Sequence, residues 1–145
     1  MIIKNKKAFF DYSILEKYEA GIALKGSEVK SIRNGKASLK ESYVRYQKGE
    51  LFVVNMHVTP YALTSDAALE PQRSRKLLLH KAQIQKLLGN ISQKGYTIVP
   101  LSLYFKKGKA KLEIAVCQGK RKHDKRQSIK KKEHQREMSR VLRRK

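Results

Sequence analysis

The chain has 145 residues, with 34 Lys and Arg against 12 Asp and Glu, a net charge of +22. This length fits a single domain, and the charge far exceeds what solubility requires, so we expect a polyanionic partner. The chain has a single cysteine, which excludes an internal disulfide. It has no run of 18 apolar residues, the length that a membrane-spanning helix needs. We therefore expect a cytoplasmic protein without membrane association.

The N-terminal segment carries Lys4, Lys6 and Lys7 ahead of any regular pattern. It is either a solvated arm or an arm that contacts phosphates. From Phe10 to Leu24 the even-numbered positions are mostly apolar, which predicts one long strand. Gly21 lets this strand bend, and bent strands are how small barrels close.

A short helix follows, with Val29 and Ile32 three residues apart on one face. Ser27 is its predicted N-cap, and Gly35 is the predicted left-handed residue after its last turn. Glu28 has two open interpretations. It either complements the helix dipole from the first turn or accepts hydrogen bonds from an exposed base edge.

Two strands are predicted around a QKGE turn, within residues 42–46 and 51–58. Residues 59–75 show neither the two-residue period of a strand nor the 3.6-residue period of a helix, and they contain Pro60 and Pro71. This segment is therefore predicted to be a long surface loop. The three leucines at 77–79 are predicted to be extended. A second helix then ends at Gly95, with an apolar stripe of Ile84, Leu87, Leu88 and Ile91.

The clearest pattern is a β-hairpin around a KKGK turn at Gly108. Its predicted buried face consists of Val99, Leu101, Leu103, Phe105, Ala110, Leu112, Ile114 and Val116. Cys117 falls on the opposite face as a structural thiol, toward the polar side or a flanking element. Together the elements predict a mainly β fold: a small closed antiparallel Greek-key β-barrel of the oligonucleotide-binding type, with two or three flanking helices and a basic C-terminal tail.

The alternation stops beyond Gly119. Residues 119–145 carry 13 basic and 3 acidic side chains (+10), against 21 and 9 (+12) in residues 1–118. We therefore expect a nucleic-acid-binding barrel at 1–118 and a separate basic tail at 119–145. Ordering 27 residues opposes folding by on the order of 30–50 kcal/mol, and the tail has few apolar groups to offset this. We predict a tail that is disordered when free and helical along a nucleic acid.

Several motifs in order resemble the SmpB family, the SsrA-binding proteins, along nearly the whole chain. They are NKKA at 5–8, EAGI at 19–22, G-x-EVKS at 26–31, SY at 42–43, N-x-H at 55–57, PY at 60–61, R-x-RKLLLH at 73–80, LYFK-x-GKAK at 103–111, and GK and DKR within 119–126. The sequence departs from the family pattern at ALEPQRSR, before RKLLLH, and at Gln127, where an acid is common.

The resemblance implies an RNA-binding adaptor without catalytic activity. Such a protein binds the tRNA-like domain of transfer-messenger RNA (tmRNA) and delivers it to the A site of stalled ribosomes for trans-translation, ribosome rescue and tagging of the nascent peptide. By the same resemblance, the tail passes the decoding centre and lies in the empty mRNA channel of the small subunit. The elongation factor that carries aminoacyl-tRNA is a further expected partner, and we expect a monomer.

The resemblance places RNA-binding roles in the body on Asn5, Lys6, Lys7, Glu28, Leu78 and Lys111. We add the neighbouring basic residues Lys30, Arg33, Arg75, Lys76 and Lys109. For the ribosome-contacting tail the residues are Gly119, Lys120, His123, Asp124, Lys125 and Arg126, to which we add Lys130, Lys131 and Arg136. Leu78 has a competing interpretation, because a leucine within LLL is usually part of a core.

Two other functions compete with this one. A ribosomal or rRNA-binding protein without a rescue function would have the same basic tail. A small basic nuclease would use His57 or His80 with a nearby lysine, although no carboxylate cluster for a metal accompanies them. The sequence indicates neither a metal site nor a cofactor.

Overall fold

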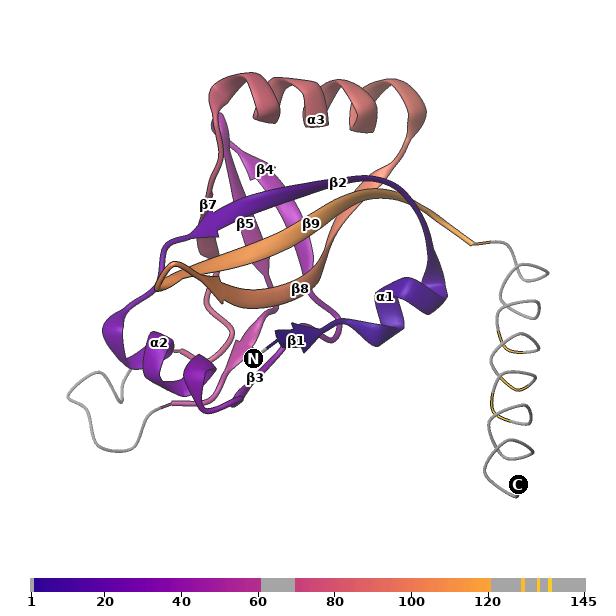
Figure 1. Ribbon diagram of the computed structural model, residues 1–145. Coiled ribbons are helices and arrows are strands. Elements are labelled where there is room, and N and C mark those ends of the chain that lie inside the picture. Colours follow the sequence, from indigo (N-terminus) through magenta and orange to yellow (C-terminus); the bar gives the residue numbers. More distant parts are fainter. Residues whose placement is uncertain (1, 61–69, 121–128, 130–132, 134–135, 137–145) are drawn as a thin grey trace.

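A computed structural model describes residues 2–60 and 70–120, together with Ile129, Glu133 and Arg136. Its elements, in chain order, are β1 (Ile2–Lys4), α1 (Lys6–Asp11), β2 (Tyr12–Ile22), α2 (Gly26–Arg33), β3 (Ala37–Ser38), β4 (Tyr43–Gln47), β5 (Glu50–Val54), β6 (His57–Val58), β7 (Arg75–Leu78), α3 (Lys81–Lys94), β8 (Thr97–Lys106) and β9 (Lys109–Gly119). Helix α3 lies across one end of the curled sheet, and α1 and α2 lie toward the other end (Figure 1).

The sheet is antiparallel, as predicted, but it is not a closed barrel. Within the described residues, seven strands pair in the order β1-β8-β9-β2-β7-β5-β4, and β3 and β6 form a separate pair. Strand β4 comes close to β8 without a hydrogen-bonded ladder between them. The expected closure is therefore wrong, because β4 keeps an unpaired edge at this seam.

The N-terminal segment is regular structure, and the predicted long strand is present as β2 but begins at Tyr12 instead of Phe10. Strand β1 pairs with β8, and α1 then continues to Asp11. The side chain of Asn5 caps α1 by accepting a hydrogen bond from the Ala8 N–H at 3.2 Å. Ala8 is buried under this short helix. The cap at Asn5 and the buried Ala8 stabilise this short helix, and neither produces a periodic pattern in the sequence.

Helix α2 begins two residues earlier than predicted. Its N-cap is Lys25 instead of Ser27, and the carboxylate of Glu28 accepts the Lys25 N–H at 2.9 Å. Gly35 has a φ of +73°, as the predicted left-handed position requires.

Both predicted hairpins and the second helix are confirmed, but the strand predicted at 51–58 is divided into β5 and β6 at Asn55, which has a φ of +64°. Strands β4 and β5 turn at Lys48 and Gly49, and β8 and β9 turn at Lys107 and Gly108. These four residues have positive φ, the geometry of tight two-residue hairpin turns. Helix α3 ends at Gly95, which has a φ of +64°.

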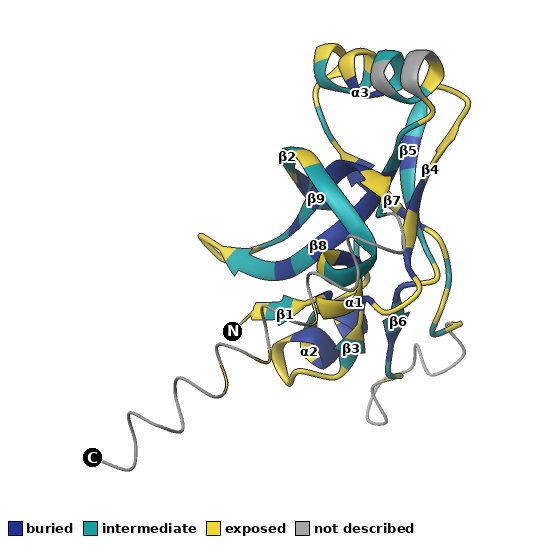
Figure 2. Cartoon of the chain, turned by 90° about the vertical axis from the view of Figure 1, so that its right-hand side faces the viewer, coloured by how far each residue is buried: buried dark blue, intermediate teal, exposed yellow. Residues whose placement is uncertain are grey.

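The hairpin β8–β9 contributes to two cores, which corrects the predicted single buried face. Leu101 is an extra residue in β8, because the pairing shifts between Pro100 and Ser102. The shift turns Val99 and Leu101 toward a second cluster that also holds Ala8, Ala115 and Cys117. Leu103, Leu112, Ile114 and Val116 belong to the main core. Figure 2 shows buried and intermediate residues along β8 and β9, whereas α3 exposes its outer side.

Cys117 faces α1, one of the two positions predicted for it. It is buried in the second cluster, and its thiol lies 3.5 Å from the Thr97 carbonyl oxygen. Burial raises the pKa of the thiol to about 11. The thiol is therefore neutral at physiological pH and acts as a small apolar group.

Candidate nucleic-acid interface

The candidate interface is built on a transverse row of residues in the sheet. Gly21 of β2 pairs with Leu78 of β7 on one side and with Lys111 of β9 on the other. Residues directly opposite each other on paired strands face the same side of a sheet. Leu78 and Lys111 therefore flank a position that has no side chain.

Gly21 keeps the space between these two side chains open. A Cβ added to Gly21 would lie 3.1 Å from the Cβ of Leu78, closer than ordinary packing allows. The result is a groove of about 620 Å³, which we call the Leu78 groove. Its walls come from β2, β7, β9, the β4–β5 turn and the first turn of α3, through Glu19, Leu78, Lys76, Lys111, His80 and Lys81 among others.

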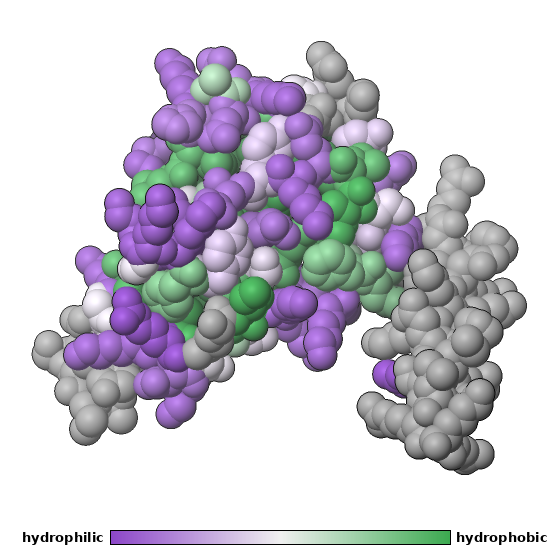
Figure 3. Space-filling model, in the orientation of Figure 1, coloured by the Kyte–Doolittle hydropathy of each residue, from purple (hydrophilic) through white to green (hydrophobic). Residues whose placement is uncertain are grey.

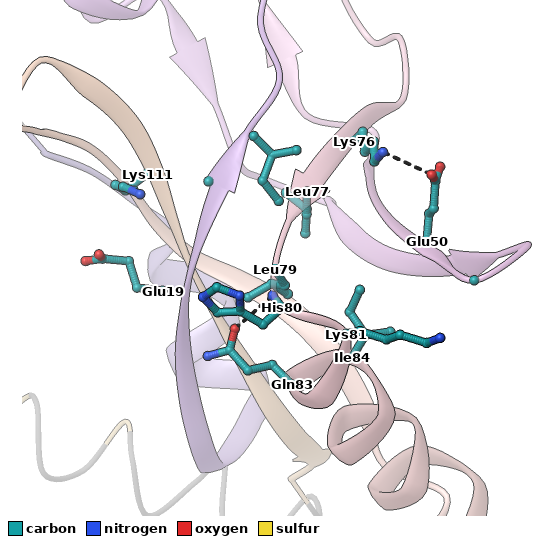
Figure 4. Close-up of a pocket in the computed structure, with 13 residues that line it drawn as sticks. Glu19, Glu50, Lys76, Leu77, Leu79, His80, Lys81, Gln83, Ile84 and Lys111 are labelled. Carbon is teal, nitrogen blue, oxygen red and sulfur yellow. Dashed lines mark hydrogen bonds and ion pairs between the residues drawn. The ribbon is translucent and has the colours of Figure 1, made fainter.

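Figure 4 shows the arrangement of these side chains. Glu19 and Lys111 lie on one side of the groove and the ion pair of Lys76 with Glu50 on the other, with His80 between them. The Lys76 ammonium is 2.9 Å from the Glu50 carboxylate. An exposed pair of this kind contributes at most about 1 kcal/mol, so Lys76 can exchange Glu50 for a phosphate.

Leu78 belongs to the surface, so the interpretation of Leu78 as a core residue is wrong. It is 54% exposed, whereas its neighbour Leu77 is 2% exposed and lies in the core. The row of three leucines thus divides between the two faces of β7. An exposed leucine beside lysines offers an apolar contact to a base or ribose while the lysines bind phosphates.

Glu19 is a groove residue that the sequence analysis missed. Its carboxylate accepts a hydrogen bond from the Tyr104 hydroxyl and lies 3.6 Å from the Lys106 ammonium. The bond from Tyr104 lowers the pKa of Glu19, and partial burial with the same bond raises the pKa of Tyr104 to about 12. Glu19 stays ionised and can accept hydrogen bonds from base amino groups. Its outward position in β2 was the available signal.

Arg75 was predicted to contact RNA, and the structure corrects this prediction. It is 1% exposed, and its guanidinium donates to Glu28 at 2.7 Å, to the Met56 carbonyl at 2.7 Å and to the Pro71 carbonyl at 3.0 Å. These bonds join α2, the residue before β6, β7 and the segment before β7. No surface remains on Arg75 with which it could meet a phosphate.

Glu28 and Asn5, two further residues with predicted RNA-binding roles, are also buried. Burial opposes ionisation of Glu28, but hydrogen bonds from Arg73, the Lys25 N–H and Arg75 outweigh it and lower the pKa of the carboxyl group. The Asn5 amide donates to the carbonyls of Leu39 and Pro100. Each side chain uses its hydrogen-bonding groups within the fold.

The remaining predicted residues of the body lie away from the Leu78 groove. The Arg33 guanidinium is 5.0 Å from the centre of the Phe105 ring, next to the β8–β9 turn that carries the exposed Lys109. Lys30 is exposed on α2. Lys6 and Lys7 are exposed on α1, where Lys7 forms an ion pair with Glu41. The predicted set therefore forms one groove and two separate basic patches.

The first residues of the predicted tail are fixed to α1. The Lys120 N–H donates to the Asp11 carbonyl at 2.8 Å, and the Lys120 ammonium donates to the Phe9 carbonyl at 3.2 Å. Gly119 and Arg136 are exposed. His123, Asp124, Lys125, Arg126, Lys130 and Lys131 lie outside the described residues, as does most of the segment for which a disorder-to-helix change was predicted.

Two further observations limit the chemistry of the site. Across residues 2–60 and 70–120, no three His, Cys, Asp or Glu side chains are grouped so that they could hold a metal ion. The described helices include none long and apolar enough to cross a membrane. Figure 3 shows hydrophilic side chains over most of α3 and the sheet beneath it, with smaller apolar patches between them.

The fold and the groove define a class: a small, strongly basic antiparallel β protein whose curled sheet presents a cationic groove with one exposed leucine. The family described as SmpB protein matches residues 2–144. The chain belongs to the SmpB family. Two similar proteins are the SsrA-binding protein of Syntrophobacter fumaroxidans, 53% identical over 99% of this chain and 89% of that protein, and the SsrA-binding protein of Geobacter sulfurreducens, 51% identical over 100% and 95%.

A solved structure is similar in fold as well as in sequence. It is described as "tmRNA-SmpB: a journey to the center of the bacterial ribosome". The TM-score is 0.70 at 46% identity, over 88% of this chain and 94% of that chain.

Proposed function

We propose that this protein is a cytoplasmic RNA-binding adaptor, and not an enzyme, that binds tmRNA and brings it to stalled ribosomes for trans-translation. The observation that carries the proposal is the row of Leu78, Gly21 and Lys111 in a chain of the SmpB family. The names of its relatives, SsrA-binding proteins, and the tmRNA-SmpB complex on the ribosome support it.

The Leu78 groove binds the tRNA-like domain in this account. Lys111 and Lys76 meet phosphates, Leu78 packs on a base or ribose, and Glu19 accepts a hydrogen bond from a base edge. The contacts to phosphates give salt-dependent affinity, and Leu78 and Glu19 give preference for one RNA over another. The elongation factor that carries aminoacyl-tRNA joins the complex through the RNA.

The tail, residues 119–145, serves the ribosome. Its second residue, Lys120, is fixed to α1 at the opposite end of the sheet from α3. Its +10 charge fits the RNA-lined mRNA channel, where it becomes helical. The two basic parts of the chain thus have different partners.

The test compares binding of the full chain to the tRNA-like domain of tmRNA and to an ordinary tRNA across a salt series. We expect tighter binding to the tRNA-like domain at every salt concentration, with a log-log salt slope of about 0.7–0.9 per phosphate contact. Equal affinity for the two RNAs would contradict the proposal. Cleavage of either RNA would instead support the alternative that the protein is a small basic nuclease.

Removal of the tail separates this function from that of an rRNA-binding protein without rescue activity. A chain ending at Gly119 should keep its affinity for the tRNA-like domain within a few-fold and lose peptide tagging on stalled ribosomes. The measurement is RNA affinity together with a tagging assay in a reconstituted translation system. A large loss of RNA affinity would show that the tail belongs to the tmRNA site, and unchanged tagging would remove the ribosomal role of the tail.

A further inference from the structure

A second groove lies at the open seam of the sheet, between the unpaired edge of β4, the start of β8 and the second half of α3. It has a volume of about 580 Å³, and we call it the tyrosine groove. Its lining includes Tyr43, Arg45, Tyr46, Tyr96, Leu88 and Ile91. It shares no lining residue with the Leu78 groove, because the first turn of α3 borders one and the second half of α3 borders the other.

Two aromatic rings at this seam are exposed. Tyr43 is 40% exposed and Tyr46 is 46% exposed, on a strand whose Val44 is buried in the core. Had β4 paired with β8 to close the barrel, its edge would have been occupied. Instead the seam leaves the edge of β4 and the two rings open to a ligand.

The chemistry of the lining favours nucleobases over a protein segment. Arg45 is the only charged residue among the residues that line this groove, and none of them is acidic. Tyrosine rings with a neighbouring guanidinium are the groups on which unpaired bases stack, and they accept any base because every base has a π face. The net charge of +22 draws a polyanion to this surface.

We propose that the tyrosine groove is a second RNA site that stacks unpaired nucleobases of a single strand on Tyr43 and Tyr46, with Arg45 contacting the strand. The site deepens the proposed function, because the single strand belongs to an RNA of the same complex. It acts independently of the Leu78 groove. One RNA molecule, or two, can therefore occupy both grooves together.

The experiment uses the full chain and a fluorescent eight-nucleotide unstructured RNA, with affinity measured from low to high salt. The variant is the double substitution Tyr43→Leu with Tyr46→Leu, which keeps apolar volume and removes both rings. We expect its affinity to fall roughly 5- to 150-fold, the effect of losing a base stack. The loss should be the same at every salt concentration, because stacking releases no counterions whereas the basic tail contributes only to the salt-dependent part.

Two controls make the result specific. Phe9→Leu removes an aromatic ring of similar exposure, 42%, from α1 outside the groove, and should leave the affinity unchanged. An eight-unit abasic strand has phosphates without bases, so the parent and the double variant should bind it equally. Thermal unfolding of each variant checks that the fold is retained. Equal binding of the base-containing strand by the parent and the double variant would overturn the proposal, as would an equal loss with the abasic strand.

Further arms identify the source of the strand and separate this site from the proposed function. A loss of affinity for full-length tmRNA, with none for its isolated tRNA-like domain, places the strand in tmRNA. A loss confined to ribosome binding places it in ribosomal RNA. Leu78→Ala should weaken binding of the tRNA-like domain and leave the affinity for the eight-nucleotide RNA unchanged. The tRNA-like domain could fail to bind while the parent still binds the eight-nucleotide RNA more tightly than the double variant does. That result would contradict the proposed function and support the tyrosine groove as an RNA site.

Discussion

The Leu78 groove and the buried network of Glu28, Arg73 and Arg75 are both charged regions drawn from the same motifs, and the fold uses them in opposite ways. In the groove, the exposed Leu78 and the half-buried Lys111 lie on either side of a glycine. In the network, Arg75 and Glu28 turn all their hydrogen bonds inward. A residue within a family motif can therefore support a site without touching the ligand.

The largest effect should come from removing the buried cation. Arg75→Ala removes one of the two arginines that pair with the buried Glu28 carboxylate, and breaking a buried ion pair costs about 3–5 kcal/mol of unfolding free energy. Chemical denaturation of the parent and the variant measures this loss. Because Arg75 has no surface, RNA affinity under conditions where the variant is folded should stay within about threefold.

A matched surface variant sharpens that result. Lys76→Ala changes the next residue, which is exposed, and should alter the unfolding free energy by no more than about 1 kcal/mol. If the folded Arg75→Ala protein lost far more RNA affinity than Lys76→Ala, the claim that the buried network acts separately from the Leu78 groove would be wrong.

Truncation of the exposed leucine should have the opposite signature. Leu78→Ala removes apolar surface that RNA covers, so affinity for the tRNA-like domain should fall roughly tenfold. Unfolding free energy should change by less than about 0.5 kcal/mol, because the side chain is 54% exposed. Leu15→Ala is the control, since Leu15 is 50% exposed on β2 outside the groove, and it should leave affinity unchanged. An equal loss of affinity for the tRNA-like domain in both variants would contradict the claim that the Leu78 groove binds this RNA.

A smaller, pH-dependent effect should identify Glu28 as part of the network. The folded-state pKa of Glu28 lies below its ordinary value of 4.5, so its contribution to stability is present above pH 4.5 and disappears as the pH falls through the folded-state pKa. The unfolding free energies of the parent and Glu28→Gln should therefore differ most above pH 4.5 and converge in acid. A difference that is constant from neutral pH into acid would contradict this role.

Local patterns predicted the parts of the fold that depend on neighbouring residues. The alternation of β8 and β9 around Gly108, the stripe of α3 and the left-handed Gly35 were all present in the sequence. The open seam was not, because it depends on whether β4 and β8, which are distant in sequence, come close enough to pair. The extra residue Leu101 was hidden for a related reason, since a bulge interrupts a period without changing residue type.

The candidate site shows the same division. The sequence located Lys76, Leu78 and Lys111, which the structure brings to one groove. It misjudged Arg75, although Arg75 shares the inward face of β7 with Leu77, because an arginine is expected at the surface unless its partners are known. It missed Glu19, because the outward position in β2 does not by itself distinguish a site residue from other surface acids until Tyr104 and Lys106 are seen beside it.

The most direct test of the account is the salt dependence of binding to the tRNA-like domain for the parent, Lys111→Ala and Lys36→Ala, where Lys36 is exposed after α2 and outside the Leu78 groove. If Lys111 meets a phosphate in the groove, the log-log slope for Lys111→Ala should fall by about 0.7–0.9, and the slope for Lys36→Ala should equal that of the parent. An unchanged slope for Lys111→Ala would contradict the claim that this groove holds the RNA.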